Sequence, residues 1–148
     1  MIALVRRAPT RDAVVERVHR GLARVARRTA VLAVRRDGYV GWTCNEAFGD
    51  VAAFRAVVVP PDVPSLFRTA GTTAVYLGPV PETPAHEALL RVMGSASHDV
   101  AAVSVRVSGR PAMVLLVDEL ADSMGGTRRM DELARAAGEA LGRLLGAR

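Results

Sequence analysis

The chain lacks what several common protein classes require. Its 148 residues include one cysteine, Cys44, so it can form neither an internal disulfide nor a cysteine-based zinc site. No apolar run approaches the ~18 residues of a membrane-spanning helix. The N-terminal residues also lack the apolar core of a signal peptide. We therefore expect a cytoplasmic protein without membrane association.

Histidine is scarce as well. His19, His86 and His98 fall on separate predicted elements, and no two of them have the spacing of metal ligands. The acidic residues form no spaced pair suited to general acid–base chemistry. We expect no metal, no cofactor and no catalytic residue, and hence a protein that is not an enzyme.

Lysine is absent, and all 20 basic residues are arginines, which leave a net charge of +5. Alanine, valine, glycine and arginine dominate, as the codon usage of a GC-rich bacterial genome dictates. Nucleic-acid binding would require interleaved aromatic residues or a recognition helix, and neither is evident. We expect the arginines to form solvated faces or to contact an acidic protein partner.

The sequence does contain a helix followed by a hairpin at its start. Apolar residues recur at helical spacing from Asp12 to Arg28, and Thr10 stands in the N-cap position. Strands over 31–34 and 39–44 follow, joined by the turn signal Asp37-Gly38. The residues before this unit, 1–10, are expected to be irregular.

The end of the chain reverses this order. Strands over 100–107 and 112–117 precede a flexible loop over 118–126 and a final helix over 130–145, which Thr127 would cap. Between the two units, shorter strands and helices are predicted, namely strands over 56–59 and 74–77 and helices over 65–70 and from Pro84 onward. Residues 1–148 thus form a single α+β domain, with an antiparallel sheet of about six strands.

This order of elements and several short phrases resemble the GAF domain, in the divergent form found in bacterial signalling proteins. The phrases are Gly41-Trp42, Val58-Val59-Pro60, Pro64-Ser65-Leu66-Phe67, Val75-Tyr76-Leu77-Gly78-Pro79 and Val114-Leu115-Leu116-Val117-Asp118. The resemblance implies that the N- and C-terminal helices pack together on one sheet face. It also implies connecting helices over a ligand cavity on the other face. The roadblock/longin fold, a scaffold of GTPase regulators, is the alternative, but it does not account for the two extra helical segments.

Five of the six aromatic residues fall in the segment that lines the cavity in GAF domains. The candidates for a ligand pocket are Trp42, Cys44, Phe48, Phe54, Phe67 and Tyr76, and Trp42 and Phe67 are expected to face the cavity. The alternative is that these side chains are ordinary core. A single cysteine does not support a redox-active pair, so Cys44 is expected to pack as a small apolar residue.

The apolar stripes of the terminal helices are the candidates for a partner interface. They contain Val14, Val18, Leu22, Leu133, Ala137, Leu141 and Leu144. Small residues on the last helix would let a second helix approach closely. We expect a homodimer, and a regulatory domain that acts through protein contacts, with other signalling domains as further partners. The alternative function is a small-molecule sensor with a ligand in the cavity.

Overall fold

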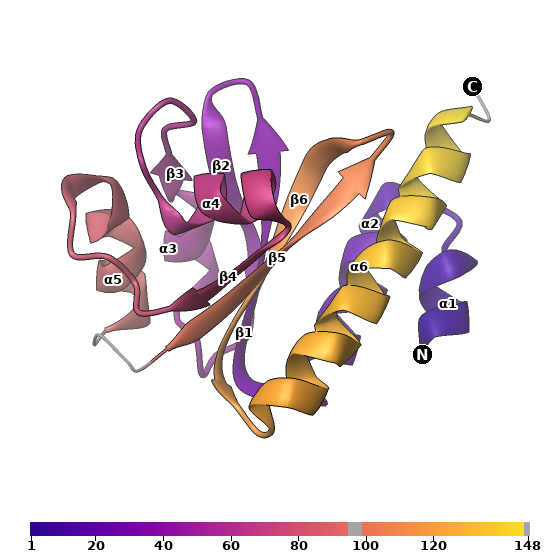
Figure 1. Ribbon diagram of the computed structural model, residues 1–148, viewed down its shortest axis with the longest axis horizontal. Helices are drawn as coiled ribbons and strands as arrows, with labels where there is room; N and C mark the ends of the chain where they lie inside the picture. The colour runs from indigo at the N-terminus through magenta and orange to yellow at the C-terminus, as the bar shows by residue number, and fades with distance from the viewer. Residues whose placement is uncertain (95–98, 147–148) are drawn as a thin grey trace.

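The computed structural model describes residues 1–94 and 99–146. A six-stranded sheet in the order β3-β2-β1-β6-β5-β4 forms its centre, and neighbouring strands pair antiparallel (Figure 1). The strands are β1 (Ala26–Arg35), β2 (Gly38–Cys44), β3 (Val58–Val59), β4 (Val75–Gly78), β5 (Val100–Val107) and β6 (Arg110–Leu120). The predicted α+β class is confirmed.

Helices cover both faces of this sheet. The terminal-helix face carries α1 (Ile2–Arg6), α2 (Arg11–Leu22) and α6 (Ser123–Gly146). The connecting-helix face carries α3 (Val51–Arg55), α4 (Leu66–Thr73), the 3-10 helix η1 (Pro84–His86) and α5 (Glu87–Met93). The first and last helices therefore lie together on one side, as the resemblance implies.

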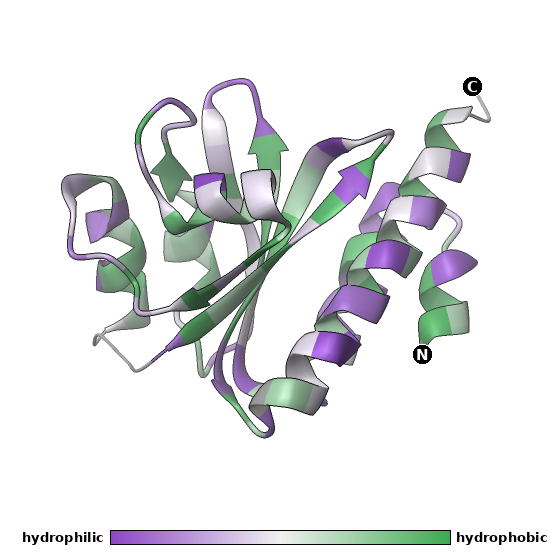
Figure 2. Cartoon of the chain, in the orientation of Figure 1, coloured by the Kyte–Doolittle hydropathy of each residue, from purple (hydrophilic) through white to green (hydrophobic). Residues whose placement is uncertain are grey.

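The sheet separates two apolar cores. On β6, Met113, Leu115 and Val117 point to the terminal helices, whereas Val114 and Leu116 point to the connecting helices. Because both faces of β6 are buried over residues 113–117, this part of the strand is apolar without interruption. Figure 2 shows the complementary pattern on α6, which is hydrophilic along its outward side.

Local signals fix several element boundaries. The Thr10 side chain caps α2 by accepting a hydrogen bond from the Ala13 N–H at 3.1 Å, as predicted. Ser65 caps α4 in the same way. The hairpin turn at Gly38 has φ +134°, and a side chain there would meet the Val59 carbonyl group. Glycine is therefore required at this turn.

The first helix is shorter than its apolar spacing predicts. It ends at Leu22, and after a tight turn the chain enters β1 at Ala26. Residues 26–33 pair with β6, so Arg27 and Arg28 belong to a strand and not to a helix face. Pairing across about 90 residues of sequence overrides the local helical pattern here.

Two further segments are more helical than predicted. Residues 2–6 form α1 where an irregular segment is expected, because α1 packs on α6: Val5 is buried and Arg6 pairs with Glu139 at 2.8 Å. The last helix begins at Ser123, so Gly125, Gly126 and Thr127 lie inside it. Packing against the sheet outweighs the low helix propensity of these glycines.

Candidate functional site

Three of the proposed pocket residues are core. Phe48, Phe54 and Phe67 are 0% exposed. The rings of Phe48 and Phe54 meet edge to face with centroids 5.3 Å apart, and the ring of Phe67 stacks on that of Tyr39 at 5.5 Å. These rings occupy the space between the sheet and the connecting helices, where the resemblance places a ligand cavity. They act as packing and not as pocket walls.

Trp42 lies on the opposite face from the one predicted. Thr43 pairs with Val31 and Gly41 with Leu32, so Trp42 is the extra residue of a β-bulge. A bulge shifts the alternation of side chains by one position. Trp42 therefore packs against the terminal-helix core, with the Arg11 guanidinium 5.0 Å from its ring centroid. The expectation that Trp42 and Phe67 share one cavity is wrong.

Cys44 is placed as a structural thiol. It is 8% exposed, and its S–H donates to the carbonyl oxygen of Gly49 at 3.4 Å. Burial, aided by the nearby Asp50 carboxylate, raises the pKa of this thiol to about 11. At neutral pH the group is a thiol and not a thiolate, so it is a poor nucleophile.

Tyr76 lies on the edge strand β4, where it is partly buried against the core that contains the phenylalanine rings. Its hydroxyl donates to the carbonyl oxygen of Pro79, the first residue after β4. Burial raises the pKa of this hydroxyl, and the Asp99 carboxylate contributes to the shift. Tyr76 therefore secures the turn after β4.

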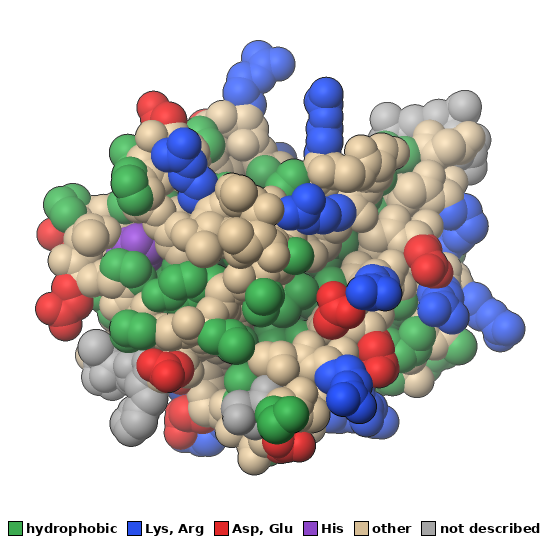
Figure 3. Space-filling view, viewed as in Figure 1, with side chains coloured by type: hydrophobic (Ala, Val, Ile, Leu, Met, Phe, Trp, Pro, Cys, Tyr) green, Lys and Arg blue, Asp and Glu red, His purple; other side chains and the backbone are tan. Residues whose placement is uncertain are grey.

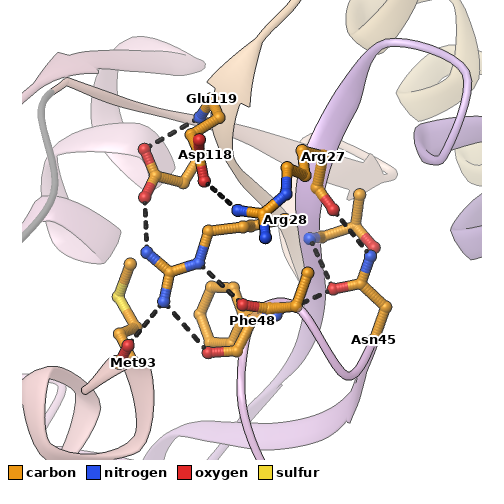
Figure 4. A network of polar contacts seen from close by, with 9 residues as sticks. Arg27, Arg28, Asn45, Phe48, Met93, Asp118 and Glu119 are labelled. Atoms are coloured by element: carbon orange, nitrogen blue, oxygen red, sulfur yellow. Dashed lines mark hydrogen bonds and ion pairs between the residues drawn. The ribbon is translucent and has the colours of Figure 1, made fainter. Parts of the chain in front are cut away.

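A buried arginine is the residue that sequence reasoning missed (Figure 4). The Arg28 side chain is 7% exposed and its Nη1 donates to Oδ2 of Asp118, itself 0% exposed, at 2.9 Å. Its Nε and Nη2 donate to the carbonyl oxygens of Ala47, Phe48 and Met93. One guanidinium therefore joins β1, β6, the segment before α3 and the end of α5.

The surrounding groups complete this network. The second Asp118 oxygen, Oδ1, accepts from the Glu119 N–H at 2.8 Å. Asn45 accepts from the N–H groups of Thr29 and Phe48 and donates to the Arg27 carbonyl, which holds the chain beside β1. The ion pair is fully partnered, and it fixes the positions of the backbone segments around it.

Two histidines have structural partners. His86 Nε2 accepts from the Leu66 N–H at 3.2 Å, and Nδ1 lies 2.7 Å from the Thr83 hydroxyl. His19 Nε2 lies 2.8 Å from the Thr29 hydroxyl. Burial lowers the pKa of both imidazoles. His98 lies outside the described residues, and the described part of the chain contains no cluster of metal-ligating side chains.

The proposed interface residues are also core. Val14, Val18, Leu22 and Ala137 are 0% exposed, Leu133 is 1% and Leu141 is 7% exposed, and Leu144 is partly buried. A second copy cannot contact these stripes while α2 and α6 remain on the sheet. The sheet and α1 cover the six buried residues, whereas Leu144 is only partly covered, and a dimer of this chain stays a prediction.

The sequence contains only weak signals of the buried Arg28–Asp118 pair. Arg28 follows Arg27 at the start of a strand that is otherwise largely apolar, and Asp118 stands near the end of a buried strand. A long-range pairing cannot be inferred from either one alone.

Of the described helices, none is long and apolar enough to span a membrane.

Solved structures with the same architecture align along almost the whole chain. A methyl-accepting chemotaxis protein, residues 122 to 287, has a TM-score of 0.72 at 18% identity, covering 97% of this chain and 94% of that one. The GAF domain/HD domain protein from Geobacter sulfurreducens has a TM-score of 0.69 at 18% identity, covering 98% and 99%. The GAF domain of the cyanobacteriochrome TePixJ has a TM-score of 0.65 at 17% identity, covering 96% and 95%.

No family model and no curated protein matches the sequence. At these sequence identities the structural alignments show the fold alone, and that fold agrees with the sheet and helix arrangement described above. The chain has the fold of GAF domains.

Proposed function

We propose that this chain is a non-catalytic regulatory domain of a signalling protein that acts through its terminal helices. The observation that carries the proposal is the different use of the two sheet faces. Buried phenylalanine rings pack between the sheet and the connecting helices, whereas α1, α2 and α6, at the two ends of the described chain, share the other face. The similar structures include a chemotaxis protein and a GAF domain/HD domain protein, which supports a role in signalling.

The absence of catalysis is part of this proposal. Cys44 has a raised pKa, and His19 and His86 are each held by structural hydrogen bonds. Nucleophilic catalysis needs a thiolate or an activated hydroxyl with a base in reach. None of these three side chains contacts another of them among the hydrogen bonds of the described residues.

We place the contact with a second copy on the outer surface of the terminal helices. Leu4 on α1 is 51% exposed, and Leu145 near the end of α6 is 52% exposed. The polar residues around them carry both signs of charge, as in the Arg6–Glu139 pair, so two copies would not repel one another strongly. A dimer formed here would link the first and last helices of both copies.

Light scattering on the purified chain tests the proposal. The chain has a mass of 15.7 kDa, so a homodimer has about twice that mass. Leu4→Glu should shift the mass to that of the monomer, because it places a charge in the interface. Leu77→Glu is the matched control, since Leu77 is 60% exposed on the edge strand β4.

Each outcome is decisive. A monomer mass for the unaltered chain at about 50 µM, a concentration at which weak dimers form, would reject the dimer. Dissociation by Leu77→Glu but not by Leu4→Glu would move the interface to the β4 edge and reject the terminal-helix surface.

A further inference from the structure

A hollow of about 610 Å³ opens at one end of the terminal-helix face. The tips of the β1–β2 and β5–β6 hairpins and the last turns of α6 border it, and Figure 1 shows these parts at the same end of the molecule. This site is on the opposite sheet face from the buried rings of Phe48, Phe54 and Phe67. Its size falls within the roughly 300–1,000 Å³ of small-molecule sites.

The floor of the hollow is apolar. Trp42, Val107, Ala112 and Leu144 line it, and each is only partly covered by the terminal-helix core. The bulge described above is what turns the Trp42 ring into this space. Water in contact with these groups would be released by an apolar ligand, which favours its binding.

The rim of the hollow is cationic. Arg11, Arg35 and Arg110 line it, and no aspartate or glutamate is among the described residues that do so. By contrast, the ion pairs found in the described structure involve other arginines, such as Arg6 and Arg28. Figure 3 shows blue side chains projecting from the upper edge of the molecule, where the hairpin tips lie.

We propose that this hollow binds an amphipathic anion, an aliphatic carboxylate of the fatty-acid class. A bare inorganic anion would pair with the arginines and leave the apolar floor wet. A neutral hydrocarbon would cover the floor but would gain no charge-assisted contact with Arg35 and Arg110, the two rim arginines that do not stack on Trp42. A carboxylate on an aliphatic chain satisfies both the charge and the apolar surface.

This site adds a ligand to the proposed function and shares Leu145 with the proposed dimer surface, but the two proposals are tested by separate measurements. The aliphatic part of the bound ligand would lie against Leu144 and Leu145 on α6, so the ligand would contact one of the helices through which the domain is proposed to act. Binding itself is measured without reference to dimer formation. If dodecanoate does not bind, the regulatory proposal is unaffected. If the chain is a monomer, the ligand proposal is unaffected.

Trp42 provides the readout, because it is the one tryptophan of the chain. Dodecanoate below its micelle concentration is expected to change the Trp42 emission saturably. Dodecyltrimethylammonium, which has the same chain and the opposite charge, and inorganic phosphate, which has no chain, should not. Higher salt should weaken the dodecanoate response, because the rim arginines are exposed and screened.

Charge reversal locates the site. Arg35→Glu with Arg110→Glu should weaken dodecanoate binding about tenfold or more, since two attractive contacts become repulsive. Arg91→Glu, an exposed arginine on α5 on the other sheet face, should leave the affinity within about twofold of the unaltered chain. Circular dichroism would show that each variant is folded, and Arg35→Gln with Arg110→Gln is the milder substitute if one is not.

The proposal is overturned if dodecanoate gives no saturable response, or if the charge-reversed variant binds as well as the unaltered chain. An equal response to dodecyltrimethylammonium would show that the arginines do not select the ligand. An equal response to phosphate would show that the apolar floor does not contribute to binding.

Discussion

The terminal-helix face and the connecting-helix face cover the same strands with different residues. Short helices and loops cover one face, and bulky rings such as Phe48 and Phe67 fill the gaps between them. One long helix covers much of the other face, and its inner surface is rich in small residues, such as Ala134, Ala137 and Ala140. The small residues let α6 approach the sheet closely, and the rings fill the space beneath the shorter helices.

The buried ion pair on the connecting-helix side should give the largest effect. Asp118→Ala leaves the Arg28 guanidinium buried without its counterion and should lower the free energy of unfolding by about 3–5 kcal/mol. Glu119→Ala removes the neighbouring exposed pair with Arg27 and should cost about 0–1 kcal/mol. Urea unfolding measures both, and equal losses would contradict the structural role of the buried pair.

Close packing on the terminal-helix side gives a smaller effect. A side chain at Gly138 of α6 would clash with the Arg106 carbonyl oxygen, so Gly138→Ala should cost about 1–3 kcal/mol. Gly142 is four residues along the same helix, and a side chain there would have only ordinary contact, 3.9 Å from Val107. Gly142→Ala should therefore stabilise the helix by up to about 1 kcal/mol. The same sign for both in thermal unfolding would show that α6 does not approach the sheet in this way.

The smallest expected effect is the loss of folding stability at acid pH, to which one histidine on each side of the sheet contributes. Burial lowers the folded-state pKa of His86, so the unfolded chain binds the proton more readily. Stability is then full above about pH 6.5, the unfolded value, and is lost as pH falls toward the folded pKa. Protonation also removes the acceptor for the Leu66 N–H. His86→Gln should reduce the fall in urea midpoint between pH 7.5 and 5.5.

His19 is the matched variant on the terminal-helix side. Burial lowers the pKa of this imidazole too, although its hydrogen bond with Thr29 opposes the shift. His19→Gln should remove a separate part of the acid sensitivity, and the variant with both substitutions should have the flattest profile. A profile unchanged in all three variants would exclude these histidines as the acid-sensitive groups.

Most of the fold could be predicted from the sequence. The turn at Asp37-Gly38, the cap at Thr10 and the two-sided burial of the last hairpin are set by residues close together in the chain. These signals depend on local backbone geometry and on patterns of burial, which sequence carries directly.

The side-chain positions at the sites could not be predicted in the same way. Trp42 changes face because of one extra residue in a strand, and no residue type marks that bulge. Arg28 shares a helix-like pattern with the residues before it, yet its partners lie 19 to 90 residues away. Its role is fixed by contacts that exist only after the sheet forms.

The order of the strands also bears on how the chain is made. β1 pairs with β6, and Arg28 and Asp118 are separated by 90 residues. At about 5–20 residues per second, synthesis of that interval lasts roughly 5–18 s. During this time the first hairpin has no partner for the inner edge of β1, which is rich in valine and alanine. Ribosome-bound chains that end before β6 should therefore associate with one another or recruit chaperones, and those that include β6 should not.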